Sequence, residues 1–90
     1  MLKFFKILIV GFLLSTATLV NAQTTEEIQQ LAGQGDALGQ AKLASLYILG
    51  RQGVEVDNQQ AAKWMKKAAE QGLVEAQVIV AAMYDRGFGL

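Results

Sequence analysis

Residues 68–87, AAEQGLVEAQVIVAAMYDRG, repeat residues 31–50, LAGQGDALGQAKLASLYILG, at an offset of 37 residues. Aligned without a gap, the two copies share seven identical residues, and a glycine closes each copy. A period of this size is typical of supersecondary units that stack side by side, so the sequence predicts a repeat protein. The identical pairs are Ala32/Ala69, Gln34/Gln71, Gly35/Gly72, Gln40/Gln77, Ala44/Ala81, Tyr47/Tyr84 and Gly50/Gly87.

Each repeat unit is predicted to be a pair of helices. The repeated glycines mark helix ends, because glycine adopts the left-handed conformation that closes a helix at little cost. Thr24 with Glu27, and Asp57 with Gln60, have the three-residue spacing of an N-terminal cap. These signals predict an all-α fold, a short α-solenoid of antiparallel helix pairs with about one and a half repeats. The expected helices are 25–33, 37–49, 58–71 and 74–86.

The spacing of large residues predicts how these helices meet. Tyr47, Trp64 and Tyr84 stand at helical intervals in or beside matched repeat positions, so we expect them to pack in the core rather than to stack on a ligand. In the third helix the alanines share the face of Trp64, which leaves a solvated opposite face. That solvated face carries Lys63, Lys66, Lys67 and Glu70. Apolar residues occupy nearly the whole circumference of the last helix, so we expect other chain segments to cover it on more than one side.

The first 22 residues have the layout of a secretory signal peptide. Lys3 and Lys6 precede an apolar run, and small residues end at Ala22, where cleavage is expected. The run from Ile7 to Val20 is shorter than the roughly 20 residues that cross a bilayer. We therefore expect a periplasmic or secreted protein of residues 23–90, with membrane attachment only if the leader stays uncleaved.

Composition excludes several classes of function for this mature chain. It holds no cysteine and no histidine, so the commonest zinc ligands, thiol nucleophiles and near-neutral bases are missing. No metal and no cofactor are expected. Without Lys3 and Lys6 the chain has six basic and eight acidic residues, a net charge of about −2. That charge disfavours nucleic acid as a partner.

Two strings carry a resemblance to a known family. Gly53-Val54, Asp57, Ala61, Trp64 and Lys67-Ala68-Ala69 form the first string; Ala69-Glu70-Gln71-Gly72, Ala76-Gln77, Met83-Tyr84 and Gly87-x-Gly89 form the second. They resemble the Sel-one-like repeat family, an offshoot of the tetratricopeptide class. The resemblance covers nearly all of residues 31–90. It implies helix pairs stacked in a right-handed superhelix, and an adaptor that holds a protein or peptide partner.

Three features depart from the family pattern. The loop from Gly50 to Val54 is one residue longer than the usual glycine-x-glycine. Gly39 stands where the family prefers alanine, which removes a packing methyl and lowers helix propensity by about 1 kcal/mol. The sequence also stops at Leu90, before the second helix of its last unit. The repeat domain is therefore expected to be cut in mid-repeat.

The favoured function is an exported, non-catalytic protein–protein interaction module. Repeat solenoids bind partners on a concave surface, formed here by the first helix of each pair. Self-association through the apolar stretch between Leu73 and Met83 is a second expectation. The candidate partner-binding residues are Gln40, Lys42, Ser45, Ile48, Glu75, Val78, Ile79, Ala82 and Asp85.

Two alternatives stay open. The first alternative is a fragment of a longer repeat protein without a role of its own. The second is a periplasmic enzyme of the β-lactam-hydrolase type found among cysteine-rich relatives. In a chain this small, the free energy gained by burying the core barely exceeds the entropic cost of ordering the chain, which favours the fragment. The enzyme is disfavoured because those cysteines are missing and no histidine can activate Ser45, Thr24 or Thr25.

Overall fold

The computed structural model describes residues 23–89; the predicted leader, residues 1–22, lies outside them. The described chain forms four helices and no strand, which confirms the all-α prediction. Three helices have the predicted bounds, and the end of α4 differs from its prediction by one residue. The helices are α2 (Thr25–Gly33), α3 (Ala37–Leu49), α4 (Asn58–Glu70) and α5 (Val74–Arg86).

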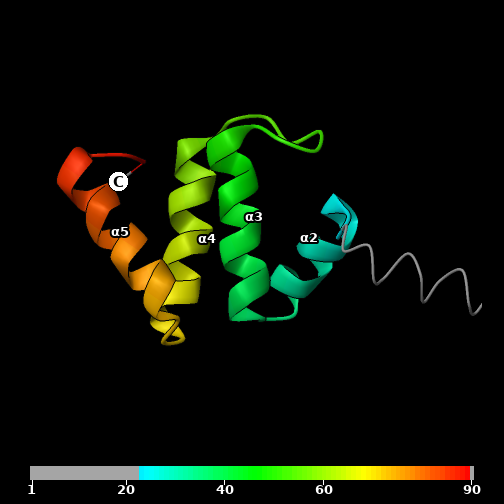
Figure 1. Ribbon diagram of the computed structural model, residues 1–90, viewed down its shortest axis with the longest axis horizontal. Helices are drawn as coiled ribbons and strands as arrows, with labels where there is room; N and C mark the ends of the chain where they lie inside the picture. Colours follow the sequence, from blue (N-terminus) through cyan, green and yellow to red (C-terminus); the bar gives the residue numbers. More distant parts are fainter. Residues whose placement is uncertain (1–22, 90) are drawn as a thin grey trace, which may run out of the picture.

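The helices form one row in sequence order, with each helix packed against the next (Figure 1). Two buried clusters join them. The smaller cluster lies between α2 and α3 and the larger one joins α3, α4 and α5, with Met65 fully buried within it. Tyr47 and Trp64 pack against both clusters. The smaller cluster is Ile28, Ala32, Leu43 and Leu46; the larger is Ala44, Ala61, Ala62, Met65, Ala68, Ala76 and Met83.

Side-chain caps hold the starts of three helices, and two of them, at Thr24 and Asp57, confirm the prediction. The backbone N–H of Glu27 donates to Thr24 Oγ1 at 3.2 Å, and that of Gln60 donates to Asp57 Oδ1 at 3.0 Å. At α3, the Gly39 N–H donates to Asp36 Oδ1 at 2.7 Å. Each acceptor satisfies one of the amides that a helix start leaves unpaired. Leu73 at the start of α5 makes no such bond.

The two copies have the same local geometry. Gly35 and Gly72 both have φ of 93°, and Gly50 and Gly87 have φ of 66° and 64°. A side-chain bond is repeated as well. Gln40 Nε2 donates to the Ala32 carbonyl at 3.3 Å and Gln77 Nε2 donates to the Ala69 carbonyl at 3.2 Å. The offset of 37 residues is therefore a structural period, and α5 is the counterpart of α3.

Tyr84 corrects one expectation about the core. Its side chain is 59% exposed, whereas its counterpart Tyr47 is half-buried. Tyr47 lies where α2, α3 and α4 meet, and no described helix stands on the corresponding side of α5. The Tyr84 ring instead faces Lys66 Nζ, which lies 5.9 Å from the ring centroid.

Gly39 has a packing role that the propensity argument missed. A Cβ at this position would lie 2.6 Å from Leu31 Cβ, closer than side chains approach. The glycine therefore lets α2 approach α3, and its buried counterpart in α5 is Ala76. At this position the absent methyl allows close contact between helices.

Candidate partner-binding site

Three of the nine predicted binding residues line one hollow. Ile48 comes from the end of α3, and Ile79 and Ala82 come from α5. The hollow encloses about 230 Å³. We call it the α3–α5 groove and define it by Ile48, Ile79, Ala82, Met83, Arg86 and Phe88.

The size and lining of the α3–α5 groove limit what it can bind. Small-molecule sites usually enclose about 300–1,000 Å³, so this volume suits one or two apolar side chains of a partner. Arg86 is the one charged residue in the lining. Its guanidinium can pair with a carboxylate at the mouth of an otherwise apolar hollow.

A wider stripe on the same side of the helices extends the groove. Glu75, Ile79, Ala82 and Arg86 follow the spacing of one face of α5, and their counterparts in α3 lie 37 residues earlier. Those counterparts include the predicted Lys42 and Ser45, together with two leucines that the prediction missed. Applying the repeat offset to the predicted Glu75 would have found Leu38, whereas Leu49 is the counterpart of Arg86, which the prediction also missed. The missed residues are Leu38 and Leu49, each 55% exposed.

Three predicted residues of α3 make contacts within the chain. Lys42 Nζ donates to Gln23 Oε1 at 2.6 Å and stays exposed, and Ser45 Oγ donates to the Ala41 carbonyl at 3.0 Å. Gln40 corrects the prediction, because only 5% of it is exposed. Its Oε1 accepts a bond from Gln71 Nε2 at 2.8 Å, so Gln40 joins α3 to the end of α4 instead of facing a partner.

Val78 and Asp85, also predicted, lie on a different side of α5. With Val74 and Ala81 they form the stripe opposite the buried Ala76 and Met83. All four stripe residues are exposed. We call this stripe of Val74, Val78, Ala81 and Asp85, together with Tyr84, the outer face of α5.

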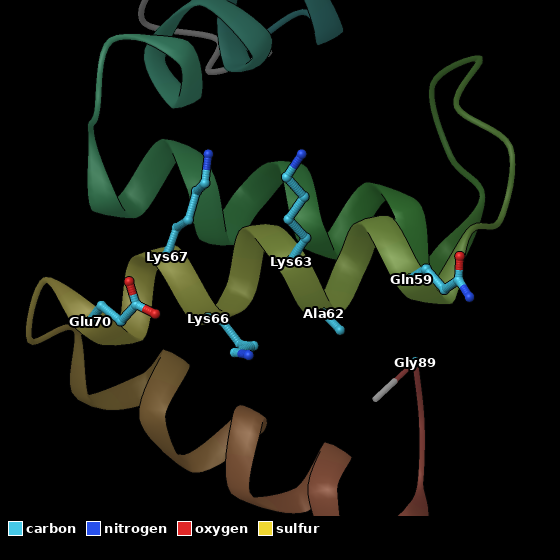
Figure 2. A pocket seen from close by; sticks show the side chains of 7 residues that line it. All are labelled: Gln59, Ala62, Lys63, Lys66, Lys67, Glu70 and Gly89. Carbon is cyan, nitrogen blue, oxygen red and sulfur yellow. The ribbon is translucent and has the colours of Figure 1, made fainter.

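A second hollow, of about 390 Å³, lies along α4 and contains three lysines (Figure 2). Figure 2 shows that Lys63 and Lys67 extend toward the α3 side while Lys66 points toward α5. The ammonium of Lys67 lies over the Trp64 ring, 4.7 Å from its centroid. The three charges do not converge on one point, so this hollow is a solvated helix face and not an anion site.

Neither a membrane span nor a metal site is found among the described residues. Within residues 23–89, no helix combines the length and apolarity that crossing a bilayer requires. The same part of the chain has no group of three acidic or other metal-ligating side chains.

Comparison with known proteins gives one match. The family model described as the Sel1 repeat matches residues 37–73, from the first residue of α3 to the residue before α5. The matched segment is one period of the repeat. No curated protein and no solved structure gave a significant match.

Proposed function

We propose, on the premise that this chain carries a Sel1 repeat, that it is an exported, non-catalytic module that binds another protein through the α3–α5 groove. Sel1 repeats typically mediate protein–protein interaction, and the family is generally non-enzymatic. The observation that carries the proposal is the groove itself. It is open, apolar and formed by the equivalent helices of successive repeats.

The partner segment that suits this groove is an extended peptide with a large apolar residue near an acidic one. The apolar side chain would fill the hollow between Ile48 and Ile79, where burial of apolar surface favours binding. The carboxylate would pair with Arg86 at the mouth. The exposed leucines Leu38 and Leu49 offer further apolar contact along the stripe.

The test is a selection of random displayed peptides against the purified chain, followed by affinity measurement of the selected peptides. Ala82→Lys places a charge in the groove, and Ala81→Lys is the matched control on the outer face. Both alanines are exposed on the same helix, and lysine is also a good helix former. We expect Ala82→Lys to weaken binding at least about tenfold, equivalent to 1.4 kcal/mol, and Ala81→Lys to leave binding unchanged. Equal effects of the two variants, or no selected peptide, would refute the proposal.

Export is the second part of the proposal and rests on the leader sequence. Expressed from the full reading frame in a Gram-negative host, the protein should be found in the periplasmic fraction with the mass of residues 23–90. Ala22→Tyr should block processing, because the peptidase requires a small residue there. A full-length mass for the unaltered protein would contradict cleavage, and recovery from the cytoplasm would contradict export.

A further inference from the structure

The outer face of α5 is separate from the α3–α5 groove and is apolar except for Asp85, which lies at its C-terminal end, where the rim of a contact surface can stay solvated. Val74 and Val78 are each 65% exposed and lie on the side of α5 that faces away from α4. Tyr84, 59% exposed, lies at the edge of this face, where its ring also contacts Lys66 of α4. Single exposed apolar residues are ordinary, whereas a continuous stripe on one helix marks a contact surface.

The repeat itself shows what covers such a face. The residues of α3 that stand 37 positions earlier pack against the cluster that α4 dominates. Ala44, the counterpart of Ala81, is fully buried by that packing. The full set of counterparts in α3 is Ala37, Ala41, Ala44, Tyr47 and Ile48.

A hydrogen bond supports the same equivalence. Gln40 and Gln77 donate to equivalent backbone carbonyls, but Gln40 Oε1 also accepts a bond from Gln71 at the end of α4. Among residues 23–89, no donor reaches Gln77 Oε1. Gln77, beside the outer face of α5, thus presents the polar acceptor, and the outer face presents the apolar stripe, that α3 presents to α4.

We propose that the outer face of α5 binds one amphipathic helix with the residue pattern of α4, supplied from outside residues 23–89. The helix needs apolar residues at the positions of Ala61, Trp64 and Met65, and an amide donor at the position of Gln71. An antiparallel orientation, as between α3 and α4, places the end of that helix that corresponds to Ala68 and Ala69 beside Val74 and Val78. Small residues then face the two bulky ones.

A second copy of this chain is a poor source of that helix. Its α4 is already packed between α3 and α5. Its α2 is the other helix of this type, but the counterpart of Trp64 there is Glu27 and the counterpart of Ala61 is Thr24. Burying the Glu27 carboxylate against apolar residues is costly, so copies do not stack end to end into a filament.

The experiment uses a synthetic peptide of residues 57–72, DNQQAAKWMKKAAEQG, titrated into the isotopically labelled chain and followed by calorimetry and amide chemical shifts. We expect saturable binding with shifts concentrated at Val74, Val78 and Ala81. Ala81→Lys should weaken binding at least about tenfold, because it places a charge in the interface. Ala82→Lys is the matched control and should leave binding unchanged. The W64E peptide, which imitates α2, should not bind.

Three outcomes would overturn this inference. The first is no binding, and the second is binding that Ala81→Lys leaves intact, which would indicate exchange with α4 of the same chain. The third is a concentration-dependent dimer of the protein alone that Ala81→Lys abolishes, which would make a second copy the occupant. The two alanines also separate this inference from the proposed function, since Ala82→Lys reports on the groove and Ala81→Lys on the outer face.

Discussion

Helices α3 and α5 have related sequences, nearly the same caps at their C-termini and different surroundings. Helix α3 lies between α2 and α4, whereas α5 packs mainly against α4 among the described helices. Ala44 is therefore buried and its counterpart Ala81 is exposed, and the same holds in part for Tyr47 and Tyr84. The repeat sequence therefore specifies a helix and its faces, while neighbouring helices decide which faces are buried.

The largest contrast is expected when the same charge is placed at both positions. Ala44→Lys buries an unpaired ammonium and should cost about 3–5 kcal/mol, enough to unfold a marginally stable chain. Ala81→Lys places the ammonium in solvent and should change stability by no more than about 0.5 kcal/mol. Urea unfolding followed by circular dichroism measures both. Equal losses would mean that the outer face of α5 is covered in solution.

Removing the two tyrosine side chains should give a smaller contrast. Tyr47→Ala should cost about 2 kcal/mol, because a half-buried ring that touches both clusters is lost. Tyr84→Ala should cost about 0.5 kcal/mol, mainly the contact of its ring with Lys66. The urea midpoints give the comparison. If the α4 peptide binds as proposed, its presence should raise the cost of Tyr84→Ala, and an unchanged cost would contradict that placement.

The starts of the two helices differ, which offers a third comparison. Asp36→Ala removes the bond to the Gly39 amide and should cost about 1 kcal/mol. Asp36→Asn is the control, because it keeps an acceptor and should cost only a few tenths of a kcal/mol. Thermal unfolding of the three proteins distinguishes them. An equal loss in both variants would show that charge, and not the acceptor, stabilises the start of α3.

The smallest effect is expected in the longer of the two glycine-bounded loops. Gln52 has φ of 55°, a conformation that glycine adopts without strain. Gln52→Gly should stabilise the chain by about 0.5 kcal/mol, the balance between relief of strain and the greater freedom of glycine when unfolded. Thr25 Oγ1 donates to the backbone carbonyl of Gln52 at 2.8 Å. This bond does not involve the Gln52 side chain, so the variant keeps it. Gln52→Ala is the control and should destabilise, and a gain in that variant would contradict the strain argument.

Local signals in the sequence predicted the helices almost to the residue. Helix ends are set by local contacts, such as the turns at Gly35 and Gly72 and the cap at Asp57, which involve residues only a few positions apart. Predicting them therefore required no knowledge of the packed chain. The second side of the apolar α5, where cover was expected, is exposed at Val74 and Val78 in the described part of the chain.

The binding surface was predicted less well, because the direction of a side chain depends on which helices flank its own. Gln40 has the spacing of a surface residue but lies where α2, α3 and the end of α4 meet. Leu38 and Leu49 are of a residue type that is usually buried, but they belong to the stripe of α3 that faces away from both α2 and α4. Lys42 and Ser45 belong to both the predicted and the observed stripe, so the prediction was wrong only at the edges of this face of α3.

The close approach at Gly39 has a consequence for lengthening this protein by design. Inserting a second copy of residues 37–73 after residue 73 would place the new Gly39 against α4, at the position where Ala76 packs without clash. A glycine there would leave a gap of one methyl group, so the inserted unit should carry Gly39→Ala while the original keeps its glycine. The two units of an extended array are therefore not interchangeable, because only the unit that packs against α2 requires glycine at residue 39.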